Sequence, residues 1–354
     1  MKGFSPRLLA MVTVAVLALM AAGLWFYQNE HHGAQQEASE QLESISRLKV
    51  GQITAWRANQ LDAGTELMGR RAFVQDVARW LAQSDAALPE NIPVTLRSLQ
   101  VRYRYHDVLV VDAGGLVRHS LTGFRGPLHA EAAAALATAL RERRPVLAEL
   151  HAGPEGLLSH LDLVAPLGIE QAASGGRPFG AVILQCDPRE FLYPFLQAWP
   201  VASASAETLL VRRDGDSVVF LHTLRHRRDT ALKLRLPLTE TNVPAVKVVL
   251  GGRGVMQGED YRGVQVLSVL SAIPNSPWFM VAKVDEAEAL AGWHTRSRLI
   301  VALLLLAVAL AGTAFLVAWQ RQGKNHFRAL HQAGEELRES EAKFRRLFES
   351  MAAG

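Results

Sequence analysis

The chain has 354 residues, of which 49% are hydrophobic and 20% charged, and its formal net charge is +4. This composition is typical of a folded protein, and the basic excess is too small to indicate a nucleic-acid-binding protein. The single cysteine, Cys186, excludes an intrachain disulfide. Its place in "GAVILQC" predicts a buried apolar side chain rather than a reactive thiol.

Two apolar segments, residues 8–27 and 299–319, contain no charged residue. About 20 helical residues cross the apolar core of a bilayer, so each segment is expected to be a transmembrane helix. Basic residues precede the first segment and follow the second, which places residues 1–7 and 320–354 in the cytoplasm and residues 28–298 outside it. A cleaved signal peptide is the alternative for the first segment, but its apolar core is longer than the usual length of about 7 to 15 residues, which favours an uncleaved anchor.

Residues 28–92 are predicted to form a long helix that rises from the membrane and ends at a proline-containing link, "LPENIP". The helical part lacks proline, and apolar residues recur at close to helical spacing at Leu42, Ile45, Leu48, Ile53 and Trp56. One face of this helix is therefore expected to be buried.

The run "VLVVDAGGLVRHS", from Val108, is echoed by "LLVRRDGDSVVFL", from Leu209. Each copy reads as a β-hairpin, with two apolar runs around a glycine-containing turn. Two more predicted strands close each copy, after a predicted helix at 130–145 in the first and a short helix at 243–250 in the second. The sequence thus predicts two α+β modules, a first module at 93–200 and a second module at 201–298.

Both modules end in a strand followed by a possible helix start. Asp187 is followed three residues later by Glu190, and Asp285 by Glu288. This is the capping-box pattern, which predicts that each aspartate caps a helix.

Together these segments resemble the double Cache (tandem PAS-like) sensor domains of bacterial membrane-bound signalling proteins. The resemblance covers residues 30–290 and is carried by the order of "SRLKVGQITAWRANQLDA", "YHDVLVVDAGGLVRHS", "SHLDLVAPLG", "DPREFLYPFLQAWP", "SAETLLVRRDGDSVVFL", "LRHRRDTALKLRLPL" and "DYRGVQVLSVLSAIPNSPWFMVAKVD". It implies an α+β fold with a long N-terminal helix and two tandem antiparallel-sheet modules. It also implies that the first module is membrane-distal and holds a small-molecule pocket, and that residues 28–298 are periplasmic or extracellular. The amino-acid-binding branch of the family carries a Tyr, Arg, Trp-Tyr cluster that is absent here, so the ligand stays open.

The strand "SHLDLVA" contains the first candidate ligand-binding residues, His160 and Asp162. Strand alternation places both on one face and the intervening leucines on the other. The pair could bind a cationic or hydrogen-bonding group, or it could face water while the leucines fill the core. Both interpretations stay open.

A second candidate group follows the first hairpin: Arg118, His119 and Ser120 at the end of its second strand, with Arg125 in the loop beyond. A guanidinium group in this place would suit a carboxylate, so an organic acid is expected as a ligand alongside an amine. The alternative is ordinary solvated side chains.

The sequence shows no catalytic motif: it lacks G-x-S-x-G, H-E-x-x-H and a P-loop. His222 and His226 are four residues apart, but the strand-like pattern and the neighbouring arginines oppose a metal ion there. The chain is therefore not expected to be an enzyme, and no cofactor or metal site is expected.

After the second apolar segment, Leu330, Leu337, Phe344 and Met351 lie seven residues apart. This spacing predicts a short coiled-coil seam and a homodimer, with a solvated amphipathic helix as the alternative. The final stretch, "ESEAKFRRLFESMAAG", resembles the entry helix of a cytoplasmic PAS domain. A histidine kinase, diguanylate cyclase or phosphodiesterase output would follow it.

The function expected from the sequence is that of the sensor and transmembrane region of a bacterial signal-transduction receptor in the inner membrane. Its first module would bind a small molecule, and the second span would pass the signal inward. The alternative is a membrane-anchored module that recognises a periplasmic protein or an envelope component.

Overall fold

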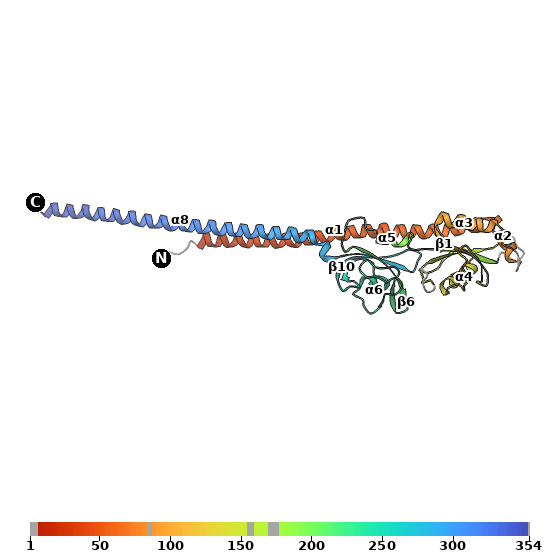
Figure 1. Ribbon diagram of the computed structural model, residues 1–354. Helices are drawn as coiled ribbons and strands as arrows, with labels where there is room; N and C mark the ends of the chain where they lie inside the picture. Colours follow the sequence, from red (N-terminus) through yellow and green to blue (C-terminus); the bar gives the residue numbers. More distant parts are fainter. Residues whose placement is uncertain (1–5, 84–86, 154–158, 169–176, 353–354) are drawn as a thin grey trace. The chain divides into compact units, whose positions relative to one another are not determined.

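A computed structural model of the chain describes residues 6–83, 87–153, 159–168 and 177–352 (Figure 1). The chain forms two compact units, one made of Met1–Gln36 with Leu290–Gly354 and the other of Glu37–Ala289. Helix α1, Pro6–Gly69, contributes to both units, and helix α8, Ala291–Ala352, belongs to the first.

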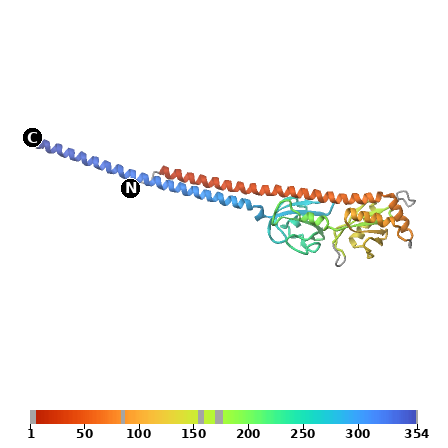
Figure 2. The same cartoon turned by 45° about the horizontal axis from the view of Figure 1, so that its top comes forward.

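In the first unit, the start of α1 lies beside the first part of α8 (Figures 1 and 2). The helices approach closely at Gly23, because a Cβ atom added there would lie 2.5 Å from a methyl group of Leu304. Near the end of the contact, the rings of Tyr27 and Trp293 pack with their centroids 5.1 Å apart. A side chain at this position could fit only if Leu304 shifted.

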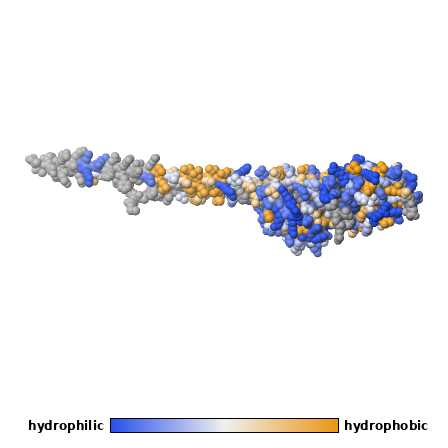
Figure 3. Space-filling model, viewed as in Figure 1, coloured by the Kyte–Doolittle hydropathy of each residue, from blue (hydrophilic) through white to orange (hydrophobic). Residues whose placement is uncertain are grey.

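Among the described residues, one helical segment is long and apolar enough to cross a membrane, Ala291–Val317. It overlaps the span predicted at 299–319, and its apolar side chains face outward as part of the band seen in Figure 3. The other predicted span, 8–27, forms the start of α1 and stays a prediction. Its side chains at Val14, Leu17, Met20 and Leu24 are also exposed.

The second unit contains two antiparallel sheets. The first sheet has the order β2-β1-β5-β4-β3. Its strands are β1 (Tyr105–Asp112), β2 (Val117–Ser120), β3 (Val146–Leu147), β4 (Leu161–Leu167) and β5 (Gly180–Cys186). Helices α1, α2 (Arg71–Leu81) and α3 (Asn91–Tyr103) pack on one face, and α4 (Ala130–Glu142) covers the other.

The second sheet has the order β8-β7-β6-β11-β10-β9. Its strands are β6 (Glu207–Asp214), β7 (Ser217–Phe220), β8 (Arg235–Pro237), β9 (Gly254–Glu259), β10 (Gln265–Ala272) and β11 (Trp278–Asp285). Helix α6 (Pro244–Val249) covers one face, and α5 (Leu192–Gln197) and α7 (Glu286–Ala289) lie before β6 and after β11. The predicted α+β class, with a long helix and two antiparallel sheets, is confirmed.

The two predicted hairpins form where the turn chemistry demands them. Asp112 Oδ1 accepts hydrogen bonds from the backbone N–H groups of Gly114 and Leu116, 3.0 Å each, and Gly115 has φ 87°. In the second hairpin Gly215 has φ 59°. Positive φ costs glycine little, so both turns close tightly.

One apolar core joins the two sheets. It runs from α1, α2 and α3 through the first sheet and reaches Leu210, Trp278 and Met280 of the second. At the same junction the carboxylate of Glu149 lies 3.0 Å from the indole Nε1 of Trp278 and 3.4 Å from the guanidinium of Arg212. Glu149, which follows β3, therefore contacts both β6 and β11 of the second sheet.

The buried face of α1 differs from the prediction at one position. Leu42, Ile45 and Ile53 are buried as expected, but Leu48 is 55% exposed. Lys49 is buried in its place, and its ammonium group donates to the carbonyl groups of Phe195, Leu196 and Ala198 at 3.1, 3.0 and 2.6 Å. A cation that binds the last carbonyl groups of α5 stabilises that helix end.

The predicted capping boxes do not form. Asp187 accepts a hydrogen bond from the N–H of Arg189 at 2.9 Å within a turn, and α5 begins only at Leu192. Glu288 accepts hydrogen bonds from the N–H groups of Ala204 and Ser205, at 3.0 and 2.8 Å, instead of capping its own helix. A local turn closed by Arg189 replaces the first predicted cap, and a tertiary contact with residues 204–205 replaces the second.

Helix α3 also follows the proline-containing link where the sequence predicted none. Its buried side chains, Ile92, Leu96 and Leu99, lie three to four residues apart and join the core under the first sheet. The helix was missed because the proline at 93 sits in its first turn, where proline is tolerated.

Candidate functional site

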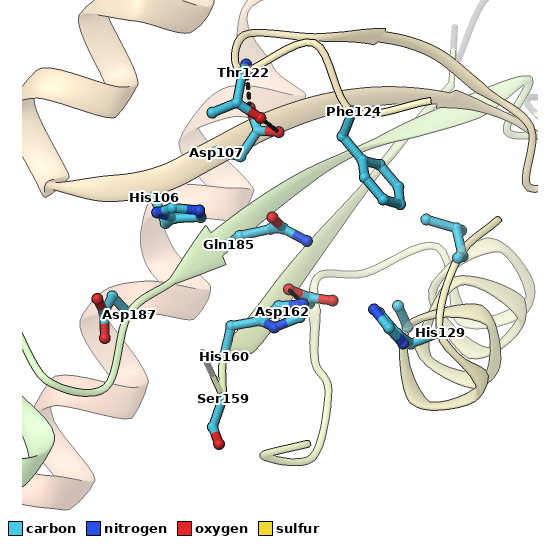
Figure 4. Close-up of a pocket in the computed structure, with 12 residues that line it drawn as sticks. His106, Asp107, Thr122, Phe124, His129, Ser159, His160, Asp162, Gln185 and Asp187 are labelled. Atoms are coloured by element: carbon cyan, nitrogen blue, oxygen red, sulfur yellow. Dashed lines mark hydrogen bonds and ion pairs between the residues drawn. The ribbon is translucent and has the colours of Figure 1, made fainter. Parts of the chain in front are cut away.

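A cavity of about 80 Å³ lies between the first sheet and α4. By the volume of roughly 10–15 Å³ that each water needs, it could hold a small molecule or several waters. Its walls come from β1, β4, β5, the β2–α4 loop and the start of α4, and its polar side chains include Asp107, Thr122, His129, His160, Asp162 and Gln185 (Figure 4). This is the face of the sheet that α4 covers.

Strand register brings three of these side chains into a row. Gln185 of β5 pairs with Asp107 of β1 on one side and with Asp162 of β4 on the other. Neighbours across a sheet share a face, so the three side chains point into one space, with Gln185 between the two carboxyl groups (Figure 4). A register shift between Tyr105 and Asp107 turns Tyr105 into the core on the opposite face.

Asp107 is saturated with hydrogen bonds. Its Oδ1 accepts from the N–H groups of Val108 and Thr122, at 2.7 and 3.1 Å. Its Oδ2 accepts from the hydroxyl groups of Ser120 and Thr122, at 2.6 Å each. Since Ser120 Oγ also accepts from the N–H of Phe124 at 2.9 Å, this carboxylate holds the loop that leads to α4.

Asp162, unlike Asp107, accepts no hydrogen bond from the described residues. It is 1% exposed, and neither of its carboxyl oxygens has a hydrogen-bond partner among the described residues. Burial, with a smaller contribution from the carboxylate of Glu131, raises the pKa of Asp162 to about 8. A buried carboxyl group without donors is costly, so Asp162 is a candidate to bind a cation or a hydrogen-bond donor.

Two histidines face this carboxyl group. The Nε2 atoms of His151 and His160 lie 3.6 Å from Asp162 Oδ2 and Oδ1 respectively. Both side chains are buried, and a distance of 3.6 Å exceeds that of a hydrogen bond. The interpretation in which His160 and Asp162 face open water is therefore wrong, and both lie in the covered interior.

His151 was not among the residues predicted from the sequence. Its Nδ1 lies 2.8 Å from the backbone carbonyl oxygen of Glu149, and its backbone forms an antiparallel bridge with that of His160. Burial lowers the pKa of His151, against the hydrogen bond to Glu149, which raises it. His129, at the N-cap of α4, completes the group, with its ring centroid 5.3 Å from that of His151 and 5.5 Å from that of His160.

The other predicted residues do not line the cavity. Arg118 lies 3.8 Å from Asp112 beside the hairpin turn. His119 is paired with Val110, whose side chain is in the core on the opposite face, and burial lowers the pKa of His119. Arg125 is exposed in the β2–α4 loop. The structure therefore gathers His160 and Asp162 at the cavity, places Ser120 behind Asp107, and leaves the three basic residues outside it.

The second module satisfies its buried charges internally. Lys283 is 0% exposed, and its ammonium group lies 2.7 Å from Asp260 and 3.0 Å from Glu207. A cavity of about 510 Å³ lies next to Glu207, His222 and Arg225.

His222 and His226 do not share a helix: the first is buried, and the second is exposed in a turn. Cys186 is buried as predicted, which raises its pKa.

No protein-family model matches the sequence, and a search of the curated proteins finds no match. Among solved structures, the ligand-binding domain of the Pseudomonas aeruginosa PAO1 amino acid chemoreceptor PctB, in complex with L-Arg, has a TM-score of 0.51 and 15% identity. The match covers 77% of this chain and 98% of that domain.

The extracellular domain of soHK1S-Z6, described as a histidine kinase, has a TM-score of 0.50 and 12% identity, over 74% of this chain and 99% of that one. At such identities the likeness concerns the fold alone, and it agrees with the long helix and the two antiparallel sheets described above. The chain therefore shares the fold of these two domains, in line with the α+β architecture that the double Cache resemblance implied.

Proposed function

We propose that the chain is the sensor and transmembrane region of a bacterial signalling receptor, and that its first module binds a small molecule in the cavity beneath α4. The observation that carries the proposal is Asp162, a buried carboxyl group that lines the cavity beside two imidazoles and whose oxygens have no hydrogen-bond partner among the described residues. A ligand that donates hydrogen bonds or carries positive charge would satisfy it. No catalytic step is assigned to the described residues.

The proposed organisation follows the order of segments along the chain. Residues 8–27 and 299–319 would be the two spans, and residues 28–298 would lie outside the cytoplasm, with residues 93–200 as the membrane-distal module and 201–298 as the proximal one. Strand β11 ends at Asp285, only a few residues before α8 begins at Ala291. The proximal module is therefore directly continuous with the second span.

Signalling in this scheme requires two arrangements of a homodimer and a ligand that favours one of them. A tenfold difference in affinity between the two arrangements supplies about 1.4 kcal/mol. That is enough to change the balance between two states of similar free energy.

The test is a thermal-stability screen of the purified chain in detergent against amines, amino acids, organic acids and divalent metal ions. A ligand at one hundred times its Kd should stabilise the folded chain by about 2.7 kcal/mol. For a region of this size that is a rise in Tm of about 5–10 °C. The rise should vanish in Asp162→Asn and persist in Asp112→Asn, which alters a turn carboxyl outside the cavity.

A ligand whose effect is unchanged in Asp162→Asn would contradict the assignment of the cavity. If no compound raises the Tm, small-molecule sensing itself is contradicted. It would favour recognition of a periplasmic protein or an envelope component.

A further inference from the structure

We propose that the cavity of the first module is a binding site for a divalent transition-metal ion, with His151, His160 and Asp162 as its ligands. This inference rests on the proposed function and names the class of ligand. Imidazole nitrogen and carboxylate oxygen are the ligand set that Zn²⁺ and its neighbours in the first transition row accept.

The first support is the spacing of the ligand atoms. One nitrogen of each histidine and one oxygen of the aspartate all lie within 4.8 Å of one another. The two distances from Asp162 to the Nε2 atoms are both 3.6 Å. Ligand atoms on a tetrahedral Zn²⁺ with bonds of about 2.0–2.1 Å lie about 3.3 Å apart, so the two histidine–aspartate distances are within a few tenths of an ångström of that spacing, and the remaining ligand atoms lie within 4.8 Å of one another.

The spacing fits an ammonium group less well. An ammonium donates along tetrahedral directions at about 2.9 Å, which would place its acceptors about 4.7 Å apart. The distances between Asp162 and the histidines are shorter than that by about an ångström. An amine would therefore have to push the carboxyl group away from both imidazoles, whereas a metal ion draws all three together.

The second support is the orientation of His151. Its Nδ1 donates to the carbonyl oxygen of Glu149, which leaves the Nε2 lone pair directed at Asp162. Metal-binding histidines usually have their second nitrogen fixed in this way. A metal ion between the Nε2 lone pair and the Asp162 oxygen would be bound by both groups.

The third support is a possible fourth ligand. His129 precedes the first turn of α4, and Figure 4 shows its ring directed from α4 toward Asp162. A small rotation of His129 would let it occupy the fourth position, so a bound ion would tie α4 to β4.

The experiment uses the full chain in detergent after treatment with a chelator and removal of the chelator. Zinc chloride and cobalt chloride are titrated separately, with magnesium chloride as a hard-cation control. We expect one equivalent of Zn²⁺ by isothermal titration calorimetry and, for Co²⁺, the visible absorption of a low-symmetry site with nitrogen and oxygen ligands. Mg²⁺, which prefers oxygen ligands, should not compete.

Three variants remove one ligand each: His151→Ala, His160→Ala and Asp162→Asn. Each should weaken Zn²⁺ binding by tenfold or more and abolish the cobalt spectrum, while His129→Ala should change the spectrum and weaken binding less. His226→Ala is the matched control, because it removes an exposed histidine outside the cavity and should bind Zn²⁺ like the unaltered chain. Circular dichroism confirms folding, and Asp162→Asn preserves the shape of the side chain.

Binding that survives in all three ligand variants, or that is lost in His226→Ala, would overturn the metal site. So would the absence of stoichiometric Zn²⁺ binding. If Zn²⁺ fails but an amine or an organic acid stabilises the chain in an Asp162-dependent manner, the metal inference falls and the sensing function stands. If no compound of any class acts through Asp162, both fall.

Discussion

Replacing Lys283 by methionine should strongly destabilise the second module. Lys283 lies in the centre of β11, is fully buried, and separates two buried carboxylates, those of Asp260 and Glu207. Methionine fills similar space but removes the positive charge, so both carboxylates lose their shared partner. Breaking a buried ion pair by removing one member costs about 3–5 kcal/mol.

The structure favours the lower end of that range, because each carboxylate retains other donors. Asp260 still accepts from the backbone and the guanidinium of Arg262, at 2.8 and 2.7 Å. Glu207 still accepts from the N–H of Arg225 at 2.6 Å and from the hydroxyl of Tyr261 at 2.9 Å. A loss of about 3 kcal/mol corresponds to a fall in Tm of about 6–12 °C for a region of this size.

The assay is differential scanning fluorimetry of the chain in detergent, with Lys233→Met as the control because Lys233 is exposed in a turn. The double variant Lys283→Met with Asp260→Asn should regain part of the lost stability, since one of the two uncompensated charges is gone. A fall in Tm of less than about 2 °C in the single variant, or a further fall in the double variant, would refute the reasoning.

Three further predictions concern pH, the loop over the cavity and the sheet. Burial lowers the pKa of His222 from 6.5 to about 4, so the folded state stays neutral while the unfolded chain protonates below 6.5. The free energy of unfolding should then be steady above pH 6.5 and fall by about 3 kcal/mol between pH 6.5 and 4, and His222→Gln should remove that part of the slope when Tm is followed against pH. Asp107→Ala removes the acceptor of four hydrogen bonds and should cost about 2 kcal/mol or more, with faster hydrogen exchange at residues 120–124; unchanged exchange there would contradict the role given to this carboxylate. Gly180→Ala would place a Cβ against the backbone carbonyl oxygen of Val111, which cannot move aside easily, so a loss of about 1–3 kcal/mol is expected by thermal unfolding. An unchanged Tm would contradict this close approach of β1 and β5.

The fold was largely predictable because its signals are local. The turn at Asp112 and Gly115, the alanine-rich α4 and the alternation in β4 each depend on residues a few positions apart. The burial of Lys49 could not be predicted from such local signals. The periodicity of α1 placed the buried stripe to within one residue, but only the carbonyl groups at the end of α5, almost 150 residues away, explain why a lysine lies inside it.

The site was predictable in part for the same reason. Alternation correctly placed His160 and Asp162 on one face, but it could not tell that α4 covers that face. His151 escaped notice because it follows a strand of only two residues and meets His160 through a chain reversal. Arg118 looked suitable for a carboxylate ligand, yet it lies beside the acidic residue of its own hairpin.

Glu149 gives the molecule a short mechanical linkage between its two sheets. Its carbonyl oxygen holds the His151 ring at the cavity, while its carboxylate is fastened to Trp278, the first residue of β11. In the proposed receptor, a ligand that moved His151 would act through Glu149 on Trp278, and so on the β-strand that ends at Asp285.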